Sequence, residues 1–130
     1  MGGFGFEDLE VYQAAREYRK KIYALVKRLP PEEKYGLAGQ MRRAAVSLTN
    51  NIAEGHGRFH YQENIQFLRH SRGSLEELLD DINICIDEKY AALDELTKLK
   101  EEGYQLLHKI NGYIAYLKRR KAAEKEVSSS

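Results

Sequence analysis

The sequence predicts an all-α protein folded as an antiparallel, up-down-up-down four-helix bundle. Apolar residues recur three or four positions apart along four long segments, which is the spacing of one face of an α-helix. The only two prolines are adjacent, at positions 30 and 31, so few residues interrupt these segments. The connections are short, which favours antiparallel neighbours. We expect one domain over residues 7–120, between a flexible N-terminus at 1–6 and a basic to Ser-rich disordered tail at 121–130.

The first predicted helix covers residues 7–29 and ends at the proline pair. Proline lacks the backbone N–H that a continuing helix needs, whereas Pro31 can occupy the first turn of the next helix. The apolar stripe of this first helix consists of Val11, Ala15, Tyr18, Ile22, Leu25 and Leu29.

The second predicted helix covers residues 31–54. Gly55 and Gly57 follow it, and we expect them to end the helix by supplying the left-handed backbone geometry common at helix termini. Its core row consists of Leu37, Met41, Ala44, Leu48 and Ile52.

The third and fourth predicted helices cover residues 61–87 and 94–120. Gly73 lies inside the third, where glycine costs about 1 kcal/mol relative to alanine. Such a cost is commonly tolerated where another helix approaches closely, and we expect that here. The main stripe of the third helix is Ile65, Leu68, Leu75, Leu79, Ile82 and Ile86, widened by Phe67, Leu78 and Cys85, and that of the fourth is Leu96, Leu99, Leu106, Ile110, Ile114 and Leu117.

Composition favours a cytoplasmic protein. The single cysteine, Cys85, excludes an intrachain disulfide, and its apolar surroundings predict an inert core residue. No apolar run approaches the roughly 20 residues that span a bilayer. The first ten residues lack the basic and apolar blocks of a signal peptide.

The net charge of +1 conceals a strong segregation of charge along the chain. Residues 16–43 hold nine Lys and Arg against three Glu, whereas residues 76–102 hold ten acids against three Lys. The segment KRRKAAEKE near the C-terminus is basic again. Segregated charge indicates binding partners more directly than the total does.

A row of polar side chains runs along the second helix beside its core stripe. At 100° per residue these side chains fall within an arc of about 80°, provided that the helix continues to its last member. Residues that flank a core stripe are partly buried, and buried polar groups need partners. The row therefore predicts a polar seam within the bundle or between subunits, with a surface for ligand or RNA, or an enzyme site, as alternatives. We name this row the polar ridge: Gln40, Arg43, Ser47, Asn51, Glu54 and Arg58.

Two further surfaces carry charge of one sign. The first helix presents a basic face opposite its core stripe, with Tyr23 placed to stack on a base, and a basic run follows the core stripe of the fourth helix. The third helix carries an acidic ridge formed by Glu76, Asp80, Asn83 and Asp87. Both charged faces could be ordinary solvated surface, or could meet across subunits. The predicted nucleic-acid-binding residues are Arg16, Arg19, Lys20, Tyr23, Lys27, Lys118, Arg119, Arg120 and Lys121.

The sequence offers little support for metal binding or catalysis. His56 and His60 are four residues apart, with Glu54 nearby, but Gly57 lies between them, and a continuous helix is not expected to align them. Di-iron bundles use Glu-x-x-His motifs, and the chain contains none. We therefore expect no cofactor and no metal, and keep a metal-binding bundle as an unfavoured alternative.

Three segments resemble one bacterial family. FEDLEVYQAAREY, YGLAGQMRRAAVSLTNNIAEGHGR and FLRHSRGSLEELLDDINICID look like the four-helix-bundle proteins encoded in intervening sequences of 23S ribosomal RNA genes, which are related to the accessory variability determinants of diversity-generating retroelements. The resemblance covers about Phe6 to Lys118. Its most specific positions are Gln40, Arg43, Ala44, Ser47, Asn51, Ile52, Ala53, Glu54, Gly55, Arg58, Gly73, Ser74 and Glu77.

The resemblance implies a non-enzymatic bundle that assembles as a homopentamer around a central channel. Its retroelement relatives bind nucleic acid and a reverse transcriptase through a basic surface, whereas this chain is nearly neutral overall. Our first functional hypothesis is an oligomeric protein that binds RNA through its basic residues. The alternative is an adaptor for a protein partner such as a reverse transcriptase, docked on the acidic ridge or on a face of the ring.

Overall fold

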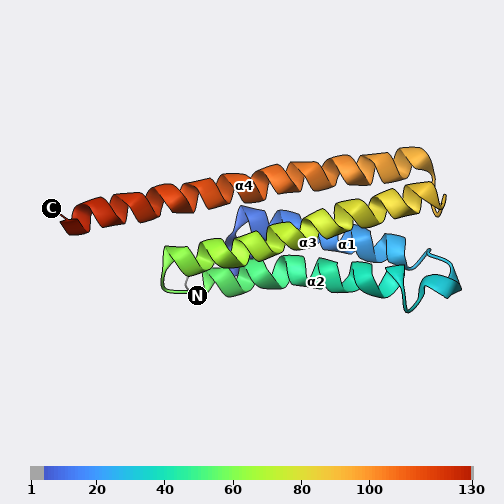
Figure 1. The fold of residues 1–130 in the computed structure, drawn as a ribbon, viewed down its shortest axis with the longest axis horizontal. Helices are drawn as coiled ribbons and strands as arrows, with labels where there is room; N and C mark the ends of the chain where they lie inside the picture. The colour runs from blue at the N-terminus through green and yellow to red at the C-terminus, as the bar shows by residue number, and fades with distance from the viewer. Residues whose placement is uncertain (1–4, 130) are drawn as a thin grey trace.

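The computed structural model describes residues 5–129; residues 1–4 and 130 lie outside the described range. Within that range the chain forms four α-helices and two short 3-10 helices and contains no strand, which confirms the all-α four-helix bundle (Figure 1). The elements are η1 (Phe6–Asp8), α1 (Glu10–Val26), η2 (Pro31–Glu33), α2 (Leu37–His56), α3 (Tyr61–Asp87) and α4 (Leu93–Ser129).

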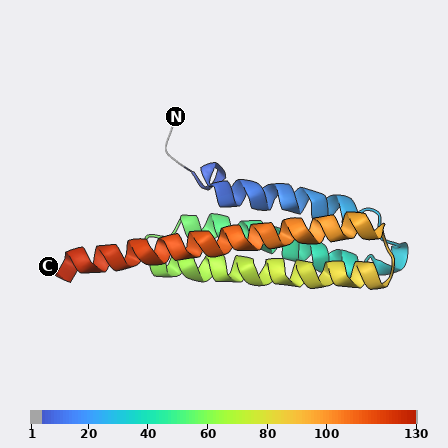
Figure 2. The ribbon, with the colours of Figure 1, turned by 90° about the horizontal axis from the view of Figure 1, so that it is seen from above.

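Helices that follow one another in the chain also lie side by side, and α4 closes the bundle against α1 (Figures 1 and 2). Two buried hydrogen bonds fix antiparallel neighbours. The Tyr18 hydroxyl of α1 donates to the Leu99 carbonyl of α4 at 2.9 Å. The Ser71 hydroxyl of α3 donates to the Leu48 carbonyl of α2 at 2.6 Å. Each bond satisfies a buried hydroxyl and sets the register of one helix pair.

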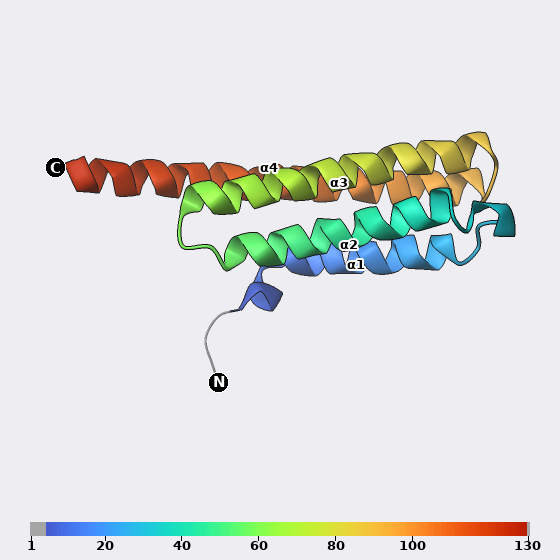
Figure 3. The same cartoon turned by 60° about the horizontal axis from the view of Figure 1, so that its bottom comes forward.

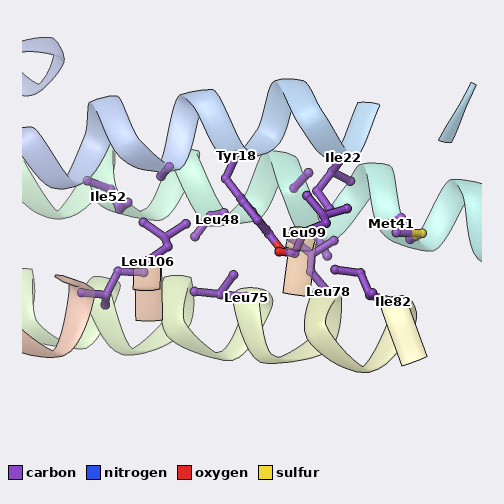
Figure 4. Close-up of a cluster of buried hydrophobic side chains, with 14 of the residues drawn as sticks. Tyr18, Ile22, Met41, Leu48, Ile52, Leu75, Leu78, Ile82, Leu99 and Leu106 are labelled. Atoms are coloured by element: carbon purple, nitrogen blue, oxygen red, sulfur yellow. The ribbon is translucent and has the colours of Figure 1, made fainter. Parts of the chain in front are cut away.

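The core lies along the bundle axis, where the apolar stripes of the four helices meet (Figure 4). Nearly every residue of the predicted stripes is buried, because each stripe faces two neighbouring helices. Cys85 is also fully buried, and burial, followed by the nearby Asp81 carboxylate, raises the pKa of its thiol to about 11. Leu29, Phe67 and Ile86 are only partly buried, since they lie at the edges of their stripes.

The N-terminal end departs from the prediction of a flexible segment over residues 1–6. Phe6 begins η1, contacts the core, and places its ring edge-on to Tyr12 at 4.9 Å between centroids. The first α-helix starts at Glu10 rather than near residue 7, because η1 ends at Leu9 in an extended conformation. The part of the prediction that concerns residues 1–4 lies outside the described residues.

The ends of α2 also differ from prediction. Residues 31–33 form the separate η2, so α2 begins at Leu37 and not at Pro31. The helix continues through Gly55 to His56, and Gly57 then has φ −77°, which is right-handed. The predicted left-handed end at these glycines is therefore wrong.

Lys89, between α3 and α4, has a left-handed backbone conformation with φ 56°. No other described residue that is not a glycine has a positive φ. The Lys89 N–H donates to the Ile86 carbonyl, and the Tyr90 N–H donates to the Cys85 carbonyl at 2.9 Å. This pair of hydrogen bonds is a Schellman motif, which satisfies the last carbonyls of a helix. Tyr90 then turns onto the core and donates its hydroxyl to Glu33 at 2.8 Å.

Close approach between helices occurs at Gly55 and Gly103 and not at Gly73, where we expected it. A Cβ atom at Gly103 would lie 2.6 Å from the Tyr18 hydroxyl oxygen, and one at Gly55 would lie 2.9 Å from Cβ of Phe67. Gly73 is exposed and has no neighbouring atom within 4 Å. Its position faces outward from α3.

The prediction of a disordered tail at 121–130 differs from the structure over residues 121–129, and its last residue lies outside the described range. Helix α4 continues past residue 120 to Ser129, and its last turns extend beyond the α2–α3 turn (Figures 1 and 3). Ala, Glu and Lys dominate residues 121–126, and these are strong helix formers that do not need a packed neighbour to prefer helical geometry. The side chains of residues 121–127 are exposed.

Candidate nucleic-acid interface

The middle of the polar ridge lies in the seam between α2 and α3. The Asn51 amide donates to the Ser47 carbonyl at 2.8 Å and to its hydroxyl at 3.0 Å. The Ser74 hydroxyl of α3 donates to Ser47 Oγ at 2.8 Å. Ser47 and Asn51 are half-buried, so these bonds satisfy their polar groups inside one protomer.

The outer members of the polar ridge are exposed. We expect Arg43 and Glu54 to be members of ion pairs between helices or between subunits. Within the protomer Glu54 pairs with Arg58, one turn away on the same segment, at 3.1 Å. Among the described residues Arg43 has no ion-pair partner, and Gln40 is exposed beside it.

The basic face of α1 is only partly available to a ligand. Arg16 and Lys27 are exposed, and Lys20 is exposed but pairs with Glu17 at 3.2 Å. Arg19 turns inward and donates to the buried Thr49 hydroxyl at 2.7 Å. Tyr23 is half-buried against the core, so only part of its ring faces outward.

The basic run of α4 lies on the extension beyond the α2–α3 turn. Lys118 and Arg119 are exposed, Lys121 donates to the Gln62 side chain, and Arg120 hydrogen-bonds the Tyr61 phenol, which raises the pKa of its guanidinium. These contacts tie the extension to the start of α3.

The structure does not bring the two predicted basic groups into one surface. Glu10 at the start of α1 pairs with Lys109 of α4 at 2.6 Å. Lys118 is nine residues further along α4 than Lys109, which is about 13 Å along the helix axis. It therefore lies past the first residue of α1. The basic face of α1 and the basic run of α4 are therefore separate surfaces.

A groove that the sequence did not indicate lies beside the basic run. It has a volume of about 850 Å³ and opens between the α2–α3 turn and the C-terminal half of α4. The run RFHY at 58–61 and the pair of tyrosines three residues apart before the basic run are its signals in the sequence, but only the fold brings them together. Its lining includes Arg58, Phe59, Tyr61, Tyr113, Tyr116 and Lys121.

The acidic ridge lies on α3 away from this groove. Glu76, Asp80 and Asp87 are exposed, and Asn83 accepts a hydrogen bond from Lys100 of α4 at 2.6 Å. Negative charge therefore gathers toward the end of the bundle at which α3 meets α4, opposite the end that carries the basic run (Figure 1).

The described residues form neither a metal centre nor a membrane-spanning helix. Over residues 5–129, no three His, Cys, Asp or Glu side chains come together in a way that could hold a metal ion. No helix in that range is long and apolar enough to cross a membrane.

Comparisons with known proteins agree with this fold. The sequence profile of the family described as 23S rRNA-intervening sequence protein matches residues 7–112. A crystal structure of a protein of unknown function from the S23 ribosomal protein family of Bacteroides thetaiotaomicron has a TM-score of 0.74 at 19% identity, covering 81% of this chain and 95% of that chain. No curated protein matches the sequence significantly. The chain belongs to the 23S rRNA-intervening sequence protein family.

Proposed function

We propose that this protein is a non-enzymatic, oligomeric bundle that binds RNA through basic side chains. One observation carries the proposal: Arg16, Lys27, Lys118 and Arg119 are all exposed and have no acidic partner among the described residues. Cations that the fold leaves unneutralised are available to phosphate groups. Half of the 20 acids that balance the cations in the net charge lie on α3 and the first half of α4.

Ribosomal RNA is the ligand that we propose first. The family description refers to 23S rRNA, and the structural relative comes from a family named for a ribosomal protein. These names support the choice of 23S rRNA fragments as the first ligand, and the exposed cations supply the chemistry.

The test compares two charge-neutralised pairs with a matched control. Arg16→Gln/Lys27→Gln removes the exposed cations of α1, and Lys118→Gln/Arg119→Gln removes those of α4. Each pair should weaken binding to a 23S rRNA fragment and reduce the slope of log affinity against log salt by about 1 for each phosphate group that the variant no longer neutralises. Lys98→Gln removes an exposed lysine beside acidic residues and should change neither quantity.

The variant that loses affinity identifies the surface that binds RNA. A loss of affinity confined to the α4 pair would place RNA on the extension, and a loss of affinity confined to the α1 pair would place it on the basic face. If both double variants bind RNA as tightly as the wild type does, the proposal that these basic residues bind RNA is refuted.

We also propose that the protomers assemble through the exposed part of the polar ridge, as a pentamer by resemblance to the family. Gln40 and Arg43 are exposed on α2, and Arg43 has no carboxylate partner within the described part of its own chain. A second copy can supply an acidic partner for Arg43, because the chain exposes a row of carboxylates on α3.

The second candidate function is an adaptor for a basic protein such as a reverse transcriptase. The exposed acids of α3 favour this function, because they present a row of negative charges along one helix, which complements a basic partner. A pull-down that recovers one specific protein after nuclease treatment, and loses it in Glu76→Gln/Asp80→Asn, would support the adaptor over the RNA-binding protein.

A further inference from the structure

The groove beside the basic run combines three elements that are distant in sequence. Phe59 lies at the tip of the α2–α3 turn, Tyr61 begins α3, and Tyr113 and Tyr116 lie on α4 more than fifty residues later. The last turns of α4 extend past this turn (Figure 3). Lys121, Glu124 and Lys125 of this extension line the groove.

Aromatic faces are unusually exposed in this groove. The side chain of Phe59 is 93% exposed, and that of Tyr116 is 47% exposed. Exposing a whole phenyl ring forgoes the stabilisation of roughly 1.5–3 kcal/mol that burial of such a side chain provides. The ring of Phe59 lies at 89° to that of its neighbour His60, with 5.0 Å between the ring centroids.

The tyrosines of α4 form a second aromatic surface. Tyr113 and Tyr116 lie nearly parallel, with an angle of 11° between ring planes and 6.1 Å between centroids. Tyr113 is half-buried and packs against the core, and burial raises its pKa. The exposed ring of Tyr116 therefore stacks on a ring that contacts the core.

Positive charge borders these rings. Arg58 lies over the Phe67 ring at 4.8 Å and pairs with Glu54, so its guanidinium is fixed at the edge of the groove. Lys121 lines the opposite wall, and Arg120 contacts Tyr61 next to it. The acid in the lining is Glu124.

We propose that this groove binds an unpaired segment of RNA, with bases stacked on Phe59 and Tyr116 and a phosphate beside Lys121. The inference rests on the proposed function and specifies its ligand further. Aromatic rings recognise bases only when the bases are unpaired and their faces are free, whereas a duplex presents phosphates and groove edges. The combination of exposed rings and bordering cations therefore selects single strands, loops and bulges over continuous helices.

The experiment measures binding of the full-length protein to three fluorescent RNAs by anisotropy. These are a ten-nucleotide single strand, the same sequence as a duplex, and a hairpin that carries it as an unpaired loop. A DNA strand of the same sequence is a fourth probe, which reports whether the 2′-hydroxyl contributes. Circular dichroism melting of each variant confirms that it is folded.

Phe59→Ala and Tyr116→Ala should each weaken binding of the single strand and the loop about 5- to 150-fold, which is the range for loss of one stacked base. Duplex binding and the salt slope should not change. Tyr116→Phe keeps the stacking face and should bind as the wild type does. Tyr35→Ala is the matched control, because Tyr35 is 89% exposed beside Lys34 and precedes the start of α2, whereas the groove lies after its end.

Each contrary outcome has a separate meaning. If wild-type protein binds the RNAs and both alanine variants bind the single strand equally well, the groove proposal is overturned and the proposed function remains. If the variants lose single-strand and duplex binding equally, base stacking is also overturned. If Phe59→Ala lowers the solution mass and leaves RNA binding intact, the groove holds a second copy instead. Absence of wild-type binding to any RNA overturns the proposed function itself.

Discussion

Asp81 is the least favourably placed charged residue of the described chain. It is 2% exposed on α3, and its Oδ2 atom is buried without a hydrogen-bond partner. Burial, followed by the nearby carboxylates of Glu77 and Asp80, raises the pKa of Asp81 to about 6. Because an unfolded aspartate has a pKa of about 3.9, the folded state binds the proton more tightly.

This shift predicts a pH dependence of stability with a definite sign. The folded state is favoured when Asp81 is protonated, so its contribution is fully present below pH 4 and is lost as the pH rises through about 6. Asp81→Asn should therefore raise the free energy of unfolding by about 1–3 kcal/mol at pH 8 and by little at pH 4. Urea denaturation at both pH values measures the difference.

The control for this prediction is Asp87→Asn, since Asp87 is exposed on the same helix and is not among the carboxylates that raise the pKa of Asp81. It should change stability little at either pH. Equal stabilisation by Asp81→Asn at pH 4 and pH 8 would show that the effect does not come from ionisation.

Gly55 and Gly73 should respond oppositely to the same change. A Cβ atom at Gly55 would lie 2.7 Å from Asn64 Oδ1 and 2.9 Å from Phe67 Cβ, so α2 and α3 would have to separate. Gly55→Ala should lower the free energy of unfolding by about 1–3 kcal/mol. Gly73→Ala meets no atom and should raise it by about 0.5–1 kcal/mol, because alanine favours the helix. Thermal melting of both variants measures these changes in stability. If Gly55→Ala stabilises the protein, the close approach of α2 and α3 at Gly55 is refuted.

At the scale of the elements, the turn between α3 and α4 depends on a strained residue. Lys89 has φ 56°, a conformation that costs a residue with a Cβ atom roughly 1 kcal/mol and glycine almost nothing. Lys89→Gly should stabilise the protein by about 0.5–1 kcal/mol in chemical denaturation. Lys89→Ala removes the charge and keeps the strain, so it should not reproduce the gain. Equal effects of the two substitutions would show that the charge matters and the backbone geometry does not.

The helical elements were predictable from sequence to different degrees. The predicted third helix, 61–87, coincides with α3, because its stripe is long and its ends meet polar turns. The end of α4 was not predictable from its stripe, since the residues after Leu117 pack on little and continue through intrinsic helix preference. The left-handed Lys89 was also unforeseen, because lysine gives no signal for that geometry.

At the scale of the whole molecule, the apolar stripes of the four helices predicted the core but not the surface groove beside the basic run. The seam that joins Ser47, Asn51 and Ser74 was expected from the position of the polar ridge beside its core row. The aromatic groove was not, because it joins a turn to a helix more than fifty residues later and has no periodicity of its own. Sequence spacing reports faces of one helix, whereas such sites depend on where separate elements end.

Substitution of Arg43 tests whether the polar ridge joins subunits. It is exposed and has no acidic partner in the described part of its own chain, so Arg43→Ala should change the stability of an isolated protomer by less than about 0.5 kcal/mol. If the polar ridge joins subunits, the same substitution should reduce the mass measured by sedimentation. Gln13→Ala, an exposed substitution on α1, is the control. An unchanged mass would place the subunit contact elsewhere.

The proposed function depends most on binding of RNA by the exposed cations. The most direct measurement is the affinity of the wild-type protein for a structured 23S rRNA fragment at 50 and 200 mM salt. We predict measurable binding at the lower concentration and a loss of at least about tenfold at the higher one, because released counterions drive phosphate contacts. No binding at 50 mM salt, or the same affinity at both concentrations, would contradict it.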